Sequence, residues 1–245
     1  MSGQLAFDLG TQPSHRREDF CLAPSNALAF RTVTGWTDWP QGKLALIGPA
    51  GSGKTHLTRL WAAEAGAQVV AAAALAGADA PDLPALVAAE RVAVEDADAV
   101  AGDAAAERAL LHLHNLLLAE GGRLLLTGRQ APARWGVVLP DLASRLAATP
   151  TAVLEAPDDR LLASVLVKLF SDRQLQVPPE LITWLTARME RSLGAARRLV
   201  ARLDARALAE SRPLSRALAA ELLAEMAETG DEAAAVLDSR PAAAP

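Results

Sequence analysis

Residues 48–55 of this 245-residue chain read GPAGSGKT, a glycine-rich stretch that ends in a lysine and a threonine. The preceding apolar run, Lys43-Leu44-Ala45-Leu46-Ile47, has the length of a buried strand, and apolar residues at helical spacing follow as far as Gly66. A strand, a glycine loop and a helix in this order are the context of a phosphate-binding loop. The stretch therefore predicts an α/β nucleotide-binding fold rather than an ordinary glycine turn before a helix.

The residues of this phosphate loop (residues 48–55) each suit a phosphate site. The glycines let the backbone curl so that successive N–H groups point at phosphate oxygens, with the positive end of the following helix behind them. Lys54 is expected to reach the β- and γ-phosphates, and the Thr55 hydroxyl is expected to ligate Mg²⁺. His56 packs next to the loop. The predicted nucleotide-binding positions here are Gly48, Pro49, Ala50, Gly51, Ser52, Gly53, Lys54, Thr55 and His56.

Composition excludes several classes of protein. A chain of 245 residues fits one large domain, or one with a small second domain, and its net charge of -5 argues against a surface built mainly to hold nucleic acid. Cys21 is the single cysteine, so neither an internal disulfide nor a cysteine metal cluster is expected. The sequence shows no membrane-spanning run and no signal pattern at its start, MSGQLAFDLG, so we expect a cytoplasmic protein without membrane contact.

Two kinds of segment divide the chain. Short apolar runs first alternate with longer helical stretches, which indicates a parallel sheet covered by helices on both faces. The expected strands are residues 44–47, 69–72, 92–94, 124–127 and 152–154, and the expected helices between them lie near 54–64, 83–89 and 105–120. Strand signals then stop, and further helices are expected at 158–170, 179–188, 194–210 and 214–229. The predicted units are a flexible tail, an α/β nucleotide domain, a helical domain and a disordered Ala/Pro tail: 1–19, 20–156, 157–229 and 230–245.

Polar residues follow two of the expected strands. Glu95 and Asp96 come directly after an apolar run, so they are expected at the carboxyl edge of the sheet beside the phosphates. There Glu95 would hold Mg²⁺ and Asp96 would direct the attacking water. Thr127 ends the next strand and is placed to orient water or the γ-phosphate. The alternatives are a solvated acidic turn and a threonine that bonds its own turn.

The order of these segments resembles a known family. GPAGSGKTHL, VAVEDAD, LLLTGRQAP and LPDLASRL resemble the Walker A, Walker B, sensor 1 and box VII segments of AAA+ proteins related to the replication initiator DnaA. Residues 20–30 resemble the adenine-side segment of that family, and LPDLASRL in particular resembles its Hda regulator branch. The resemblance covers residues 4–210. It implies an AAA+ domain with a five-stranded parallel sheet between helices, followed by a small all-α lid.

Two arginines take roles from this resemblance. Arg145, in the box VII match, would be an arginine finger that stabilises the γ-phosphate of a nucleotide held by a neighbouring protomer. An i,i+4 ion pair with Asp141 is the alternative. Arg198, four residues after Gly194, would contact the γ-phosphate from the lid as sensor 2, unless it is a solvated lid arginine. Glu95 stands where the family has an aspartate, which puts hydrolysis by this chain in doubt.

The start of the chain resembles the peptide by which Hda proteins dock on the polymerase sliding clamp. The Gln4 amide would bond in a polar niche while Leu5, Phe7 and Leu9 enter an apolar groove. A tail with incidental apolar residues is the alternative. No helix-turn-helix domain follows the lid stretch in this sequence, so we expect contact with DNA only through the clamp. The lid arginines are expected to form a solvated helix face rather than a DNA patch.

Together these features imply a regulator of DnaA. It would bind ADP or ATP with Mg²⁺, dock on the sliding clamp and stimulate hydrolysis of DnaA-bound ATP, while its own ATPase activity would be weak. Trp36 and Trp39, which precede the first strand, are candidates to flank the adenine. Two alternatives stay open: a self-contained AAA+ ATPase of the helicase-loader type, and a clamp adaptor with another partner. Whether the chain forms a homo-oligomer is also open.

Overall fold

The computed structural model describes residues 20–77 and 80–226. One sheet with the strand order β2-β3-β4-β1-β5 forms its centre, and every strand pairing in it is parallel. The strands are β1 Lys43–Ile47, β2 Gln68–Ala71, β3 Arg91–Glu95, β4 Arg123–Gly128 and β5 Thr151–Val153. Each overlaps an expected strand, and the predicted α/β class with a five-stranded parallel sheet is confirmed.

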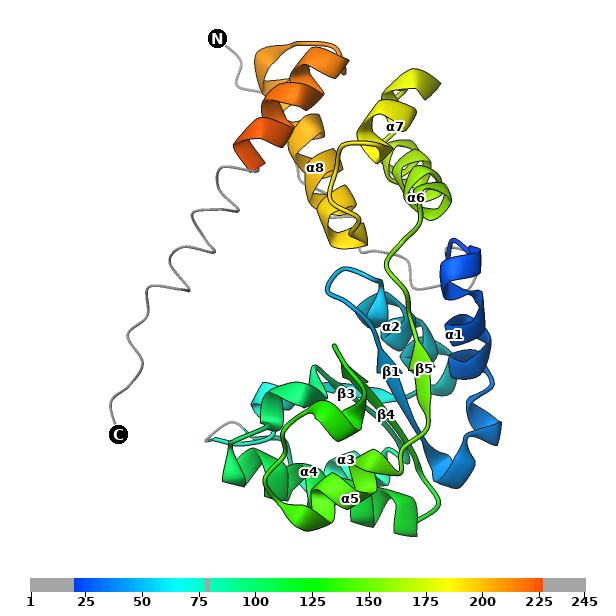
Figure 1. The fold of residues 1–245 in the computed structure, drawn as a ribbon, viewed down its shortest axis with the longest axis vertical. Helices are drawn as coiled ribbons and strands as arrows, with labels where there is room; N and C mark the ends of the chain where they lie inside the picture. The colour runs from blue at the N-terminus through cyan, green and yellow to red at the C-terminus, as the bar shows by residue number, and fades with distance from the viewer. Residues whose placement is uncertain (1–19, 78–79, 227–245) are drawn as a thin grey trace, which may run out of the picture.

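Helices cover both faces of the sheet (Figure 1). The helices are α1 Pro24–Thr34, α2 Lys54–Ala65, α3 Leu83–Ala88, α4 Ala104–Ala119 and α5 Pro140–Ala147. Because successive strand residues point to opposite faces, Leu125 of β4 packs with α1 and α2, whereas Leu124 and Leu126 pack with α4 and α5. Burial on both faces explains why these strands read as continuous apolar runs.

A separate group of helices follows β5. It consists of α6 Asp159–Asp172, α7 Pro179–Thr186, α8 Leu193–Glu210 and a helical stretch over residues 216–226. These helices share an apolar cluster of their own that includes Phe170, Leu185 and Leu199. The group stands over the carboxyl ends of the strands (Figure 1) and is called the lid here. In the part of the chain that is described, no helix is long and apolar enough to cross a membrane.

Candidate nucleotide site

The phosphate loop connects β1 to α2 at the carboxyl edge of the sheet. Gly51 and Gly53 have φ angles of +71° and +107°, in the left-handed region that favours glycine. A Cβ on Gly48 would lie 2.2 Å from the carbonyl oxygen of Leu154, so the loop also passes too close to the end of β5 for a side chain there. The three glycines are therefore required by the backbone path itself.

Lys54 begins α2 and folds back over the loop. Its Nζ donates hydrogen bonds to the carbonyl oxygens of Gly48, at 2.8 Å, and Pro49, at 3.0 Å. Burial lowers the pKa of Lys54, and this effect outweighs the raising influence of Asp96 and Asp98. The two aspartates are thus close enough to act on the Lys54 charge. The structure brings the loop and the predicted acidic segment together, as the sequence led us to expect of a phosphate site.

Two hydrogen bonds join the acidic segment to the end of β4. The backbone N–H of Asp96, at a φ of +52°, donates to the Thr127 hydroxyl at 2.9 Å, and the N–H of Arg129 donates to Asp98 Oδ2 at 3.1 Å. Thr127 is buried and pairs with Leu46 of β1, so it lies between the acidic segment and the strand that leads into the loop. Thr127 therefore bonds a neighbouring strand's segment, in addition to any role toward a ligand.

The residues predicted to hold Mg²⁺ have suitable chemistry. Glu95 ends β3, and its buried Oε1 has no hydrogen-bond partner among the described residues, which is costly for a carboxylate oxygen unless something binds it. Thr55 is exposed in the first turn of α2. Mg²⁺ is usually held by one or two protein oxygens, with phosphate oxygens and water completing its shell. This donor set fits the ion, and when bound the ion would neutralise phosphate charge.

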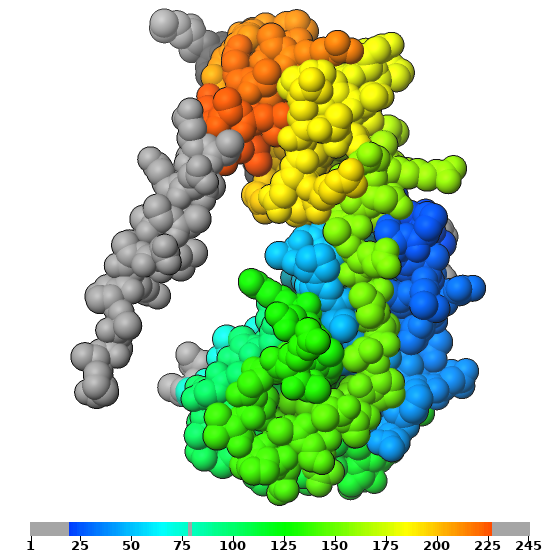
Figure 2. All heavy atoms as spheres, in the orientation of Figure 1, coloured from blue at the N-terminus to red at the C-terminus, as the bar shows by residue number. Residues whose placement is uncertain are grey.

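The lid rests on the phosphate loop. The backbone N–H of Leu193 donates to the Gly51 carbonyl at 2.8 Å, and a Cβ on Gly51 would lie 1.9 Å from Ser192 Oγ. Figure 2 shows the same contact as the yellow segment at the start of α8 seated on the light-blue loop. The loop is thus in direct contact with the part of the chain that would move if the lid moved.

Two adjacent arginines of α8, Arg197 and Arg198, are both exposed and have different charged neighbours. Arg198, the predicted sensor 2 residue, is exposed and lies 4.0 Å from Glu190 of the lid. Arg197 lies four residues after Leu193 and so shares the helix face that contacts the loop. The Arg197 residue is also exposed; partial burial of its guanidinium lowers its pKa, and the positive charge of Arg59 in α2 lowers it further. The preference for Arg198 over Arg197 as the phosphate contact therefore stays a prediction.

Aromatic rings gather at the start of α2. Phe20 stacks between Phe30 of α1 and His56, with centroid distances of 4.8 Å and 5.6 Å. The two tryptophans predicted to flank the adenine lie elsewhere. Trp39 stacks on Trp61 at 5.2 Å, and Trp36 lies under the guanidinium of an arginine that begins β3. These contacts hold both rings against other parts of the domain, and a role for either ring beside the adenine stays a prediction.

Arg145 lies on the opposite edge of the sheet from the phosphate loop. It is exposed in the last turn of α5, and its carbonyl oxygen accepts a hydrogen bond from Lys43 Nζ at 3.3 Å. Lys43 begins β1 whereas the loop follows its end, so the two lie about 15 Å apart at a rise of ~3.3 Å per residue. Among the ion pairs of the described residues, none joins Arg145 to Asp141. The predicted clamp-binding residues Gln4, Leu5, Phe7 and Leu9 fall outside the described residues.

Comparison with known proteins identifies the family. No family model matches the chain. The replication initiator DnaA of Sphingopyxis alaskensis is 30% identical over 217 residues, which cover 79% of this chain and 48% of that protein. Domain III of Thermotoga maritima DnaA superimposes with a TM-score of 0.74, at 19% identity, over 87% of this chain and 97% of that structure. This chain is a DnaA-like AAA+ protein.

The DnaA-like chain spans about half the length of the curated relatives that it matches. AMPPCP-bound DnaA from Aquifex aeolicus superimposes with a TM-score of 0.65, at 18% identity, over 79% of this chain and 66% of that structure. In the DnaA-like fold found here, backbone N–H groups, Lys54 and an acid–threonine pair converge at one edge of the sheet. That arrangement can bind and polarise a phosphate, while Arg145 stands apart from it.

Proposed function

We propose that this DnaA-like protein binds an adenine nucleotide, ADP or ATP, with Mg²⁺ at its phosphate loop, and that the nucleotide sets the position of the lid. The contact between Leu193 and Gly51 carries this proposal, because phosphate bound by the loop would act on the lid directly. A structural neighbour, DnaA of Aquifex aeolicus, is bound to AMPPCP, which supports an adenine nucleotide. Arg198 would couple the lid to the phosphates as sensor 2, with Arg197, whose pKa is affected by Arg59 of α2, as a second candidate.

The proposed output is regulatory inactivation of DnaA. Arg145 would enter the nucleotide site of DnaA as an arginine finger and stimulate hydrolysis of DnaA-bound ATP. Its place at the edge opposite the phosphate loop supports action on a second protein rather than on the chain's own nucleotide. Gln4, Leu5, Phe7 and Leu9 would dock the protein on the sliding clamp. Weak hydrolysis by the chain itself agrees with Glu95 in place of the usual aspartate.

Arg145→Ala tests the finger. The variant should bind ADP as tightly as the original chain, because Arg145 is remote from the loop. It should lower stimulated hydrolysis of DnaA-bound ATP by ~10³-fold, the lower end of what an arginine finger contributes. The measurement is release of labelled phosphate from ATP-loaded DnaA with clamp and DNA present. Arg160→Ala, an exposed arginine of α6, is the matched control. Undiminished stimulation by Arg145→Ala would refute the finger.

Clamp docking and the alternative functions have separate tests. Replacing Gln4, Leu5 and Phe7 by alanine should abolish retention on immobilised clamp, and continued retention would place the docking site elsewhere. Steady-state ATPase assays distinguish the helicase-loader type of enzyme, for which intrinsic turnover would be fast. Clamp binding without any effect on DnaA would favour a clamp adaptor with another partner.

A further inference from the structure

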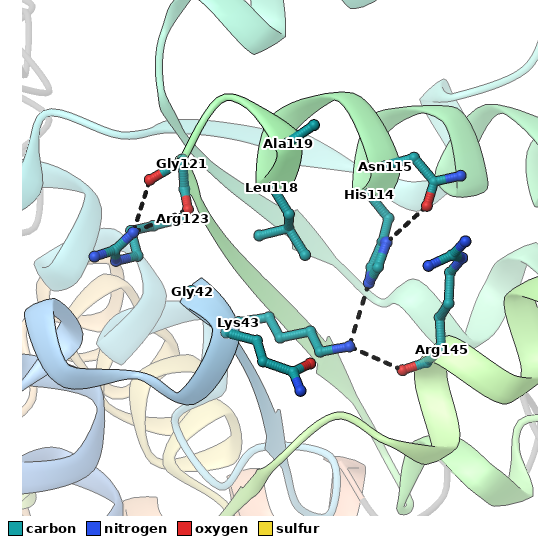
Figure 3. Close-up of a pocket in the computed structure, with 11 residues that line it drawn as sticks. Gly42, Lys43, His114, Asn115, Leu118, Ala119, Gly121, Arg123 and Arg145 are labelled. Atoms are coloured by element: carbon teal, nitrogen blue, oxygen red, sulfur yellow. Dashed lines mark hydrogen bonds between the residues drawn. The ribbon is translucent and has the colours of Figure 1, made fainter.

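A pocket opens at the amino-terminal edge of the sheet, on the side opposite the phosphate loop (Figure 3). The start of β1, the end of α4, the turn into β4 and the end of α5 enclose a volume of about 620 Å³, called the edge pocket here. Its lining includes Lys43, Arg123, Arg145 and His114 but neither aspartate nor glutamate. The edge pocket thus concentrates positive charge without a carboxylate among its lining residues.

Lys43 is the unusual member of this group because its side chain is buried, at 4% exposure. A buried ammonium is normally paired with a carboxylate. The neighbours of Lys43 Nζ are instead the Nε2 atom of His114, at 3.4 Å, and the carbonyl oxygen of Arg145, at 3.3 Å. Nδ1 of His114 lies 3.2 Å from Asn115 Oδ1, which assigns the ring proton to Nδ1 and leaves Nε2 as the acceptor. The described residues therefore supply two uncharged acceptors for three N–H groups.

A simpler explanation accounts for part of this arrangement. The Arg145 carbonyl belongs to the last turn of α5, and the negative end of a helix dipole favours a nearby cation. That carbonyl also accepts a hydrogen bond from the Thr149 hydroxyl at 2.9 Å, so Lys43 shares the oxygen with a second donor. Capping explains why a lysine is tolerated at the start of β1. It does not explain why two arginines line the same pocket.

Among residues 20–77 and 80–226, the two arginines have no acidic partner. Arg123 donates to the carbonyl oxygens of Gly121, Gly122 and Thr37, and its Nε is buried without a hydrogen-bond partner. The Arg145 side chain is exposed, and no ion pair within the described part of the chain includes it. The positive charge of Lys43 is destabilised, because burial and then the Arg145 charge lower the pKa of Lys43. A bound anion would stabilise that charge.

We propose that the edge pocket binds a phosphate group, with Lys43 and Arg145 as its ligands and Arg123 at its rim. A planar guanidinium fork and a point-like ammonium that line one pocket from different elements suit a tetrahedral anion with several acceptor oxygens. The volume exceeds that of one phosphate and admits a di- or triphosphate. Because Arg145 is also the proposed finger, the consequence for regulation rests on the proposed function: phosphate held here would withhold Arg145 from DnaA.

Calorimetric titration of sodium pyrophosphate into the full chain tests the site. The protein is first saturated with ADP in Mg²⁺-free buffer, so that the phosphate loop is filled. We expect one saturable site, weakened at least tenfold in both Lys43→Met and Arg145→Gln. Lys168→Met is the matched control and should bind within twofold of the original chain, because Lys168 is a half-exposed lysine of the lid that pairs with Asp172. No saturable binding to the original chain, or equal binding to Arg145→Gln, overturns the proposal.

The design separates this proposal from the finger role. Circular dichroism and ADP binding check that Lys43→Met is folded; if it is not, Arg145→Gln decides alone, because its side chain is exposed. Pyrophosphate should inhibit stimulation of DnaA hydrolysis by the original chain and not by Lys43→Met. Pyrophosphate binding without any stimulation would contradict the finger role and support the phosphate site in the edge pocket. Stimulation without pyrophosphate binding would support the finger role and contradict the phosphate site.

A competition experiment identifies the source of the phosphate. ATP-loaded DnaA is added to the complex of the original chain with pyrophosphate. Displacement of pyrophosphate would assign the edge pocket to phosphates of a nucleotide held by a partner protein. Retention of pyrophosphate would assign it to a free phosphate compound. Both results support an anion site, and they differ in which molecule fills it.

Discussion

Glu107 in the first turn of α4 is a buried carboxylate that holds the segment leading into α5. At 2% exposure it accepts hydrogen bonds from the backbone N–H groups of Gly102, Val138 and Leu139. Val138 and Leu139 lead directly into α5, which carries Arg145 in its last turn. Glu107→Gln should therefore both destabilise the protein and loosen α5.

The size of the effect follows from the two carboxylate oxygens. Oε1 accepts from Gly102 and Val138, each at 3.0 Å, whereas Oε2 accepts from Leu139 at 2.7 Å and from Val138 at 3.2 Å. A glutamine keeps one oxygen and turns an NH₂ toward a backbone donor. Loss of one charge-assisted bond, together with an unpaired N–H, costs ~2–3 kcal/mol. At ~2–4 °C per kcal/mol for a chain of this size, Tm should fall by ~4–12 °C.

Thermal unfolding followed by circular dichroism and tryptophan fluorescence measures this change. Buried Trp135 lies in the segment before α5 and reports on it. Glu120→Gln, exposed at the end of the same helix, is the control and should leave Tm within about 1 °C, as expected of a surface change. Equal Tm values for Glu107→Gln and the original chain would refute the reasoning.

Acid should remove the stability that the Glu107 carboxylate provides. Burial alone would raise the pKa of Glu107, but hydrogen bonds from Val138, Gly102 and Leu139 outweigh it and hold the pKa below its ordinary value of 4.5. The unfolded chain then binds the proton more readily than the folded chain. The stability that the carboxylate provides is therefore present above pH 4.5 and is lost as the pH falls through the folded pKa. Glu107→Gln should lack this contribution to acid sensitivity.

Gly51→Ala should weaken ADP binding at least tenfold in a fluorescence titration, because the added Cβ would meet Ser192 Oγ at 1.9 Å and push the lid from the loop. Gly66→Ala, also at positive φ but with open space around it, should retain ADP affinity; equal losses would contradict the steric argument. Burial, and then the nearby cations Lys43 and Arg145, lower the pKa of His114 despite its bond to Asn115, so the original chain should lose stability as the pH falls below 6.5. Urea unfolding at several pH values measures this loss, and His114→Asn should remove it. Exposed His112→Asn should keep that loss, and an unchanged pH profile in His114→Asn would count against a buried neutral imidazole.

Local pattern was sufficient for most of the fold. Strands buried on both faces must be apolar throughout, so the apolar pattern of residues 44–47 and 124–127 predicted strands without knowledge of their neighbours. The phosphate loop could also be predicted from the sequence, because its glycines and Lys54 are needed for the geometry of one short segment. The sheet order could not be predicted from the apolar pattern alone, since parallel strands have no local signal for which strand lies beside which.

The sequence by itself thus determined the α/β class, the loop and the residue types that face phosphate. Only the tertiary structure decided which groups meet. It joined Thr127 to Asp96 across two strands, brought Arg197 within reach of the Arg59 charge, and stacked Trp39 on Trp61. It also brought Lys43, which belongs to no motif, against the backbone of Arg145, 102 residues later. Such contacts depend on helix rotation and strand order, which arise from packing of the whole chain and leave no periodic trace in any one segment.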